Sequence, residues 1–349
     1  MKIKLLLLLF LILPLFSGCF NYKEIEDGVS VSAISIDRGD EKKYSVSIEV
    51  IKTSEEGKSE TEVLSGEGDS IHRALYYMSS MLNNDIYLGH CESLILSKDI
   101  AEKGINEILE YFIRNNEFRK DMVVFVSKTE TAKEILEGTN IEGQIVGYEI
   151  TNTVDSDSKH EGNTIYSPVY KLVANIERKK GAPIASVVDI DQSNDKSKLK
   201  VNGCAYFSDD KLAGFLSTEE TQILNILRND AKEIKITLNE MGVTLKNIST
   251  NRKKDNNSVV ISTNADFEIF ETAGKLVNDK QNIKRTEEEL NLKIDLLVEK
   301  MQKSKQIDVF KIATLYDKKG ETFREFYSNL KITTNAEIKL KGSGTVDEE

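Results

Sequence analysis

The sequence predicts an α+β fold in which mixed β-sheets are flanked by helices, arranged as two to three α/β domains in one chain. Three observations support this prediction. The chain has 349 residues, of which 39% are hydrophobic, enough for more than one core. Apolar segments of period 2, typical of half-buried strands, alternate with segments of helical period in the first half. In the second half several strand-like runs are followed by one long amphipathic helix.

The first twenty residues have the pattern of a lipoprotein signal. Lys2 and Lys4 precede an apolar run over residues 5–16, which has the length of a signal-peptide core and is shorter than the roughly 20 residues that span a bilayer. The run ends in "FSGC", which resembles a bacterial lipobox. We therefore expect residues 1–18 to be removed and Cys19 to carry a lipid anchor, an S-diacylglycerol group and an N-acyl group such as palmitate.

Two other interpretations of this segment stay open: an ordinary secretory signal with an incidental cysteine, and an uncleaved membrane anchor. No A-x-A-like site follows the apolar run, which disfavours the first, and Pro14 and the shortness of the run disfavour the second. Removing residues 1–18 would change the formal charge from −11 to −13. Such an acidic protein has no electrostatic footprint for nucleic acid, and its attachment to an anionic membrane must come from the lipid.

Residues 19–190 are predicted to form an N-terminal mixed α/β domain. Residues 44–50 alternate apolar and polar side chains behind the turn residues 37–43, so a β-hairpin is expected there. Asp69 or Ser70 is placed to cap the next helix. The other expected elements are helices at 71–82, 98–121, 129–138 and 165–181 and strands at 92–97, 122–127 and 182–190, with exposed polar stretches at 52–69 and 139–163.

The second half begins after a polar segment, residues 191–198, that is predicted to be a domain boundary. Residues 198–230 form a predicted middle region, a hairpin that turns at "SDD" and a helix whose capping box is Ser217 and Glu220; this region is a candidate for a separate small domain. Residues 231–345 are predicted to form a C-terminal α/β domain. Its expected elements are strands at 233–238, 242–250, 258–272 and 333–342 and a long helix at 281–305.

No catalytic, cofactor or metal site is predicted. His72, His90 and His160 are scattered without a second ligand at metal-binding spacing, and no P-loop, G-x-S-x-G or G-x-G-x-x-G motif occurs. The acidic run at 155–158 lacks the spacing of a calcium loop. Cys91 and Cys204 stand in apolar strand-like segments, so we expect buried free thiols; His90 is expected to be buried and hydrogen-bonded.

Three segments resemble the Ger(x)C family, the lipoprotein C subunits of spore germinant receptors. The first is "SGCFNYKEIEDGVSVSAISID" from residue 17, with the family's lipid-bearing Cys, aromatic residue and basic-acidic pair. The second is the block over residues 87–136. The third, "VNGCAYFSDDKLAGFLSTEE" from residue 201, is the most specific. The resemblance implies three mixed α/β domains and a non-enzymatic subunit on the outer face of the spore inner membrane, working beside membrane-embedded A and B subunits that sense nutrients.

Two functional hypotheses follow. The first is a receptor lipoprotein that docks to the A and B subunits. The basic residues Arg114, Arg119 and Lys120 are weak candidates for its docking surface, because cations at a helix end are also favoured by the helix dipole. The second hypothesis is a solute-binding lipoprotein or a surface hydrolase of the cell envelope, for which a multi-domain α/β protein offers room for a cleft.

Overall fold

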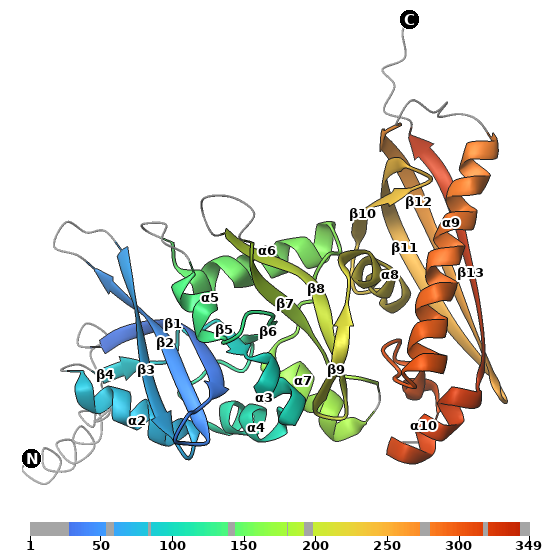
Figure 1. The fold of residues 1–349 in the computed structure, drawn as a ribbon. Helices are drawn as coiled ribbons and strands as arrows, with labels where there is room; N and C mark the ends of the chain where they lie inside the picture. Colours follow the sequence, from blue (N-terminus) through green and yellow to red (C-terminus); the bar gives the residue numbers. More distant parts are fainter. Residues whose placement is uncertain are drawn as a thin grey trace, which may run out of the picture.

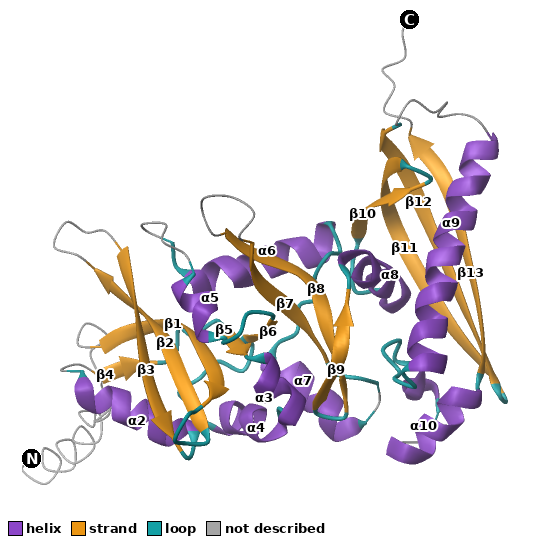
Figure 2. Cartoon of the chain, viewed as in Figure 1, coloured by secondary structure: helices purple, strands orange, loops and turns teal. Residues whose placement is uncertain are grey.

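Two bodies of structure stand side by side in a computed structural model of the chain (Figures 1 and 2). The structure describes residues 28–53, 59–82, 85–138, 144–179, 181–191, 198–272, 280–316 and 320–342. The N-terminal body comprises the described residues from 28 to 216, and the C-terminal body those from 233 to 342. The predicted signal segment 1–18 and Cys19 lie outside the described residues.

The N-terminal body is built on a mixed sheet. Its strands are β1 Gly28–Arg38, β2 Tyr44–Thr53, β3 Ser59–Gly68, β4 Asp85–Tyr87, β5 Ser93–Leu96, β6 Val123–Ser127, β7 Ile184–Asp191, β8 Lys198–Ser208 and β9 Lys211–Leu216. They lie in the order β3-β2-β1-β5-β6-β7-β8-β9, and β4 pairs with the start of β1. The centre β1-β5-β6-β7 is parallel, whereas both outer pairs of strands are antiparallel.

Helices cover both faces of this sheet, because the central strands are apolar on both sides. Every residue of β5 and β6 is buried, as expected for strands enclosed between two layers of helices. One face packs against α2 Ile71–Met81, α3 Lys98–Lys103, α4 Asn106–Arg114 and α7 Val169–Arg178. The opposite face packs against α5 Lys133–Glu137 and α6 Val146–His160.

The C-terminal body is a second sheet lined by one long helix (Figure 1). Its strands β10 Glu233–Leu238, β11 Met241–Asp255, β12 Ser258–Glu271 and β13 Lys331–Gly342 lie in that order, antiparallel except for the last pair. Helix α9, Lys280–Glu299, continues as a π-helical turn to Ser304, and α10, Gly320–Asn329, follows a short 3₁₀ turn. Helix α8, Thr218–Arg228, lies between the two bodies and packs on both sheets.

The predicted α+β class is confirmed, and so are the elements with local signals. The first hairpin turns between Arg38 and Tyr44, and Ser70 caps α2 by accepting a hydrogen bond from the backbone amide of Arg73. The β8–β9 hairpin turns at Asp209, whose φ is 56°, and Ser217 with Glu220 forms the predicted capping box of α8. The predicted strands and long helix of the second half correspond to β10 to β13 and α9.

Three predictions within the first half are wrong. Residues 59–68, expected to be an exposed stretch, form edge strand β3 on β2. The helix expected over 98–121 breaks at Gly104, whose φ of +128° lies outside the helical region, and α4 ends at Arg114. Residues 146–160, expected to be part of a loop, form α6. Helix α10 had no sequence prediction.

The segment 191–198, predicted to be a domain boundary, joins two strands that pair with each other. Strands β7 and β8 are hydrogen-bonded from Ile184↔Tyr206 to Asp191↔Lys198, so the N-terminal sheet continues across the segment. Within the predicted middle region 198–230, the hairpin is therefore the edge of this sheet, and α8 leads to the C-terminal body. The division of the chain into domains stays a prediction.

Candidate functional site

The basic residues predicted as docking candidates are engaged within the protein's own fold. Lys120 Nζ donates to the carbonyl oxygens of Phe112 at 3.0 Å and Asn115 at 2.5 Å, at the C-terminal end of α4. Arg119 binds Asp121 at 2.9 Å and Glu92 at 3.0 Å. The hydrogen bonds of Lys120 close the end of a helix, as the dipole argument predicts. This cluster therefore offers few free donors to a partner.

The contacts of Cys91, Cys204 and His90 are those of residues with a structural role. Cys91 and Cys204 are buried free thiols, as predicted, and burial raises the pKa of Cys204 to about 12. His90 is exposed, so the prediction of burial is wrong, but the predicted hydrogen bond exists, 3.0 Å from Nδ1 to Ser30 Oγ. Among the described residues, no group of three or more His, Cys, Asp or Glu side chains is placed to hold a metal ion.

Buried carboxylates hold distant elements in place. Glu49 of β2 is fully buried and accepts backbone hydrogen bonds at 2.9 Å from Val146 and Gly147, the first residues of α6, and another from Ser32 Oγ. Asp37 of β1 likewise accepts hydrogen bonds from the backbone amides of Ala132 and Lys133 at the start of α5. Burial raises the pKa of both carboxyls, while these hydrogen bonds oppose the rise. Neither residue was singled out from the sequence, because the partner lies almost a hundred residues away.

The junction of the two bodies contains a charged network. Arg228, at the end of α8, is buried and pairs with Asp230 at 2.6 Å; it also donates to the carbonyl oxygen of Val309 at 3.1 Å. Lys311 approaches Asp230 to 3.1 Å. Burial alone would raise the pKa of Asp230, but Arg228 and Lys311 outweigh it and lower this pKa to about 2. Burial, together with Arg228, lowers the pKa of Lys311 to about 8.

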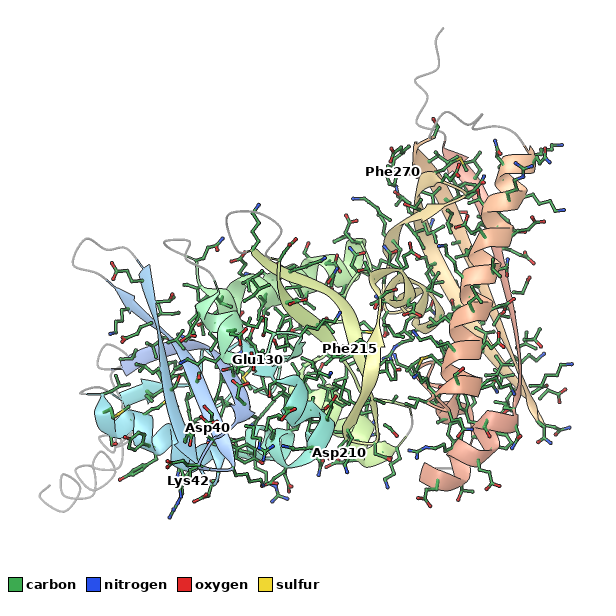
Figure 3. All side chains as sticks on the ribbon, viewed as in Figure 1. Asp40, Lys42, Glu130, Asp210, Phe215 and Phe270 are labelled. Atoms are coloured by element: carbon green, nitrogen blue, oxygen red, sulfur yellow. The ribbon has the colours of Figure 1, made fainter. Side chains whose placement is uncertain are left out.

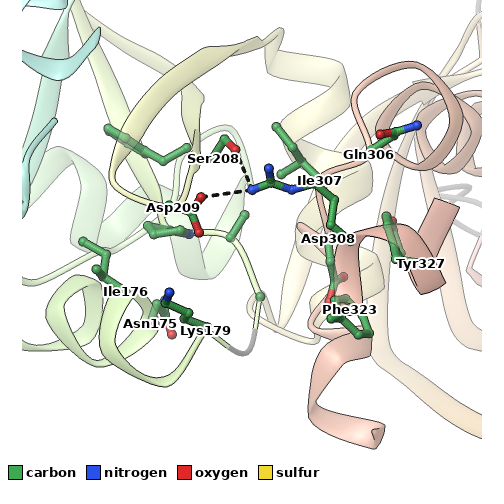
Figure 4. A pocket seen from close by; sticks show the side chains of 15 residues that line it. Asn175, Ile176, Lys179, Ser208, Asp209, Gln306, Ile307, Asp308, Phe323 and Tyr327 are labelled. Atoms are coloured by element: carbon green, nitrogen blue, oxygen red, sulfur yellow. Dashed lines mark hydrogen bonds and ion pairs between the residues drawn. The ribbon is translucent and has the colours of Figure 1, made fainter. Parts of the chain in front are cut away.

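A cavity of about 70 Å³ lies at the same junction (Figure 4). On one side it is lined by the end of α7 and the β8–β9 turn, and on the other by residues 306–308 and α10. Arg324 of α10 crosses the junction to Asp209 at 3.0 Å and Ser208 at 3.1 Å. The cavity is therefore bounded by contacts that join the two bodies.

The outer face of α2 carries three of the exposed large apolar side chains among the described residues of the N-terminal body. Tyr76 is 70% exposed, Tyr77 54% and Met81 56%, while Ala74 and Met78 on the inner face are fully buried. We call Tyr76, Tyr77 and Met81 the aromatic face of α2. Exposed aromatic side chains in a group indicate an interaction surface more often than isolated ones do.

The described residues define a class of protein first. It is a two-body α+β protein in which buried charged side chains connect separate elements and an apolar helix face is exposed. None of the helices that the structure describes is long and apolar enough to cross a bilayer.

Comparison with known proteins gives the family. The model described as "Spore germination protein N-terminal domain" matches residues 21–190, and the model "Spore germination B3/ GerAC like, C-terminal" matches residues 202–344. The chain therefore belongs to the GerAC-like spore germination proteins, the Ger(x)C family that the sequence resembles.

Individual relatives are distant. Spore germination protein KC of Bacillus subtilis is 23% identical over 236 residues, covering 61% of this chain and 56% of KC. Spore germination protein B3 of the same organism is 24% identical, and 59% of it is covered, so the chain spans less than two thirds of both relatives. Spore germination protein GerQC of Bacillus cereus is 22% identical, with 97% of this chain and 99% of GerQC covered.

A solved structure has the same fold. The crystal structure of the GerBC protein matches with a TM-score of 0.55 at 16% identity, over 88% of this chain and 96% of that one. The likeness therefore covers both bodies described above.

Proposed function

We propose that the protein is the lipoprotein C subunit of a nutrient germinant receptor and acts without catalysis, by docking to membrane-embedded A and B subunits. The observation that carries this proposal is the match of spore germination family models to both halves of the chain, over residues 21–190 and 202–344. Its function would then lie in its surfaces, since the described residues present engaged charges and exposed faces rather than a convergent set of reactive groups.

The proposed location is the outer face of the spore inner membrane, with Cys19 carrying the lipid. Gly28, where β1 begins, follows Cys19 by nine positions, so the folded part would be tethered on a leader of at most about 30 Å. Two acyl chains on the diacylglycerol group hold a protein at a membrane, whereas one chain is marginal.

Neither recess described below favours the alternative, a solute-binding lipoprotein or surface hydrolase. The junction cavity of about 70 Å³ is small beside the roughly 300–1,000 Å³ of typical ligand pockets. A wider recess of about 490 Å³ between the β1–β2 loop and α3–α4 is lined largely by charged side chains, including the ion pair of Lys43 with Glu107 at 2.6 Å. Typical ligand sites are mostly apolar.

The anchor is tested by Cys19→Ala in the full-length chain. We expect the variant to carry no lipid and either to keep its signal segment unprocessed or to leave the membrane fraction, and spores carrying it to germinate more slowly with nutrients. Mass spectrometry of the N-terminal peptide and fractionation of spore membranes measure the two effects. Cys204→Ala is the matched control, a cysteine substitution outside the lipobox that should leave membrane attachment intact. A Cys19→Ala protein that is processed, stays in the membrane fraction and supports undiminished germination would contradict the proposal.

The docking is tested by copurification of the A and B subunits with the tagged C subunit from dormant spores. We expect both to copurify in mild detergent. Recovery of the lipidated protein without either subunit would contradict docking and leave the anchor unaffected.

A further inference from the structure

Helix α2 differs in charge from the rest of the protein. The chain has a formal charge of −11, yet residues 71–81 contain no Asp or Glu and carry His72 and Arg73. No described residue forms an ion pair with the Arg73 side chain. The helix itself therefore carries no acidic side chain and one basic one, next to its exposed tyrosines, on a protein that is acidic as a whole.

The aromatic face is not needed for packing. Ile71, Ala74, Leu75 and Met78 face the sheet and are buried, which already gives α2 the apolar stripe that a surface helix requires. Tyr77 and Met81 stand one turn apart on the solvent side, with Tyr76 beside them, and all three are more than half exposed. Their exposure costs solubility unless another surface covers them.

The end of α2 lies close to the start of β1 (Figure 1). Strand β4 begins four residues after Met81 and pairs in parallel with the start of β1, with Asp85 opposite Gly28. Four residues span at most about 14 Å. Cys19 is nine positions before Gly28, so the predicted lipid lies at most about 30 Å of chain from the start of β1, beside which α2 ends.

A recess of about 340 Å³ adjoins this face, lined by Tyr76, Tyr77, Arg73 and Lys42, together with Glu67, Gly68, Asp69 and Ser80. The two carboxylates are engaged: Asp69 with Lys42 at 3.4 Å, and Glu67 with the backbone amides of Asp40 and Glu41. Arg73 is thus the cation in the recess with no acidic partner among the described side chains, placed beside two phenol rings.

We propose that the aromatic face of α2 rests on the lipid headgroups of the membrane and orients the tethered protein. This proposal depends on the lipid anchor proposed above. Tyrosine suits the site because its ring is apolar and its hydroxyl group is polar and hydrated. Such side chains concentrate at the headgroup level of membranes. Arg73 favours anionic headgroups, and because α2 itself has no acidic residue, the repulsion there is weaker than over the acidic remainder of the protein.

The absence of tryptophan from the chain makes a direct test possible. Tyr77→Trp in the full-length lipidated protein places a single tryptophan in the aromatic face. The matched control is Phe270→Trp, an equally conservative change at a residue that is 60% exposed and lies at the opposite end of the molecule (Figure 3). Both proteins are reconstituted into vesicles of phosphatidylcholine and phosphatidylglycerol, with and without brominated acyl chains, and vesicle flotation is measured in the same samples.

The expected result for Tyr77→Trp is a blue shift of the emission on vesicle binding and a loss of intensity with brominated lipid, while Phe270→Trp keeps a water-exposed spectrum. Floated Tyr77→Trp protein with unquenched emission overturns the proposal but leaves the anchor intact. Shielding of its fluorophore only after the integral subunits are added assigns the face to a protein partner instead. Equal quenching in both variants also overturns the proposal. Protein that fails to float contradicts the anchor, and the orientation proposal with it.

Discussion

At the scale of single residues, burial decides how much a charged side chain contributes to stability. Arg228 has 3% of its side chain exposed and satisfies both Asp230 and a backbone carbonyl, whereas Arg114 is 77% exposed and pairs with Glu110 one helical turn away. Both ion pairs have a closest distance of 2.6 Å. Their energetic roles differ because a buried charge that loses its partner has no water to replace it.

Arg228→Ala should therefore destabilise the protein by about 3 kcal/mol, since it leaves the Val309 carbonyl without this donor and Asp230 with Lys311 as its remaining cationic partner among the described residues. Arg114→Ala, the matched control, should change the free energy of unfolding by less than about 1 kcal/mol. Urea denaturation of both variants measures the difference. Equal, small effects would contradict the structural role given to the junction network.

The lowered pKa of Asp230 also predicts how the stability of the protein depends on pH. Its pKa is lowered from 3.8 to about 2, so the unfolded state binds more protons than the folded state between these values. The contribution of Asp230 is therefore complete above about pH 4 and is lost as the pH falls toward 2, with a total of about 2 kcal/mol. Denaturation of the wild type and of Asp230→Asn from pH 2 to 6 measures this. The wild type should lose more stability over this range; parallel curves would contradict the assignment.

At the scale of elements, α8 shows how a local signal fixes a helix start. Ser217 Oγ accepts from the backbone amide of Glu220 at 3.2 Å, and the Glu220 carboxylate accepts from the amide of Ser217 at 2.9 Å. The other Glu220 oxygen binds Lys300 Nζ at 2.6 Å. The capping residue thus also sets where α8 stands against the end of α9.

Ser217→Ala should lower the free energy of unfolding by about 1 kcal/mol, the usual effect of losing an N-cap. Ser80→Ala is the control, because the Ser80 hydroxyl is exposed and donates only to the Tyr77 carbonyl oxygen within its own helix; it should change stability by less than about 0.5 kcal/mol. Thermal unfolding followed by circular dichroism compares them. A control as damaging as Ser217→Ala would mean that the cap contributes nothing specific.

Local signals also explain which elements the sequence predicts. The β8–β9 hairpin, α8 and β10 to β12 carry turn residues, a capping box and period-2 alternation, and these patterns lie within each segment. The large apolar side chains that α6 buries are Val146, Ile150 and Val154, a narrow stripe, and the first backbone amides of α6 donate to Glu49 of strand β2. Strand β3 likewise depends on pairing with β2. Their stability comes from tertiary contacts that no local pattern contains.

The candidate surfaces also depend partly on local patterns and partly on tertiary contacts. The lipobox and the helical period of α2 can be read from adjacent residues, but that α2 ends beside the start of β1 depends on the parallel pairing of Asp85 with Gly28. Sequence alone also placed Arg114, Arg119 and Lys120 together as possible docking residues. It could not show that Glu92, 27 residues from Arg119 in the chain, forms an ion pair with Arg119.

At the scale of the whole molecule, the two bodies share a core. Ile184, Tyr206 and Leu216 of the N-terminal sheet belong to the same buried cluster as Leu224 of α8 and Phe267 of β12. Arg324 adds a polar contact across the junction. Separating the bodies would expose apolar side chains on both sides, which costs about 25 cal/mol for each Å² uncovered.

We therefore expect the bodies to unfold together rather than as independent domains. Tyr111→Trp reports on the N-terminal body, where it packs edge-on to Phe112 and Phe118, and Phe326→Trp reports on the C-terminal body beside Tyr316. Because the chain has no other tryptophan, each variant reports on one body alone. Urea curves for the two variants should coincide with each other and with circular dichroism, the mark of one cooperative transition. Distinct midpoints for the two reporters, with circular dichroism curves that do not differ between the variants, would contradict this expectation. They would show that the junction couples the bodies weakly and that each body unfolds as an independent domain.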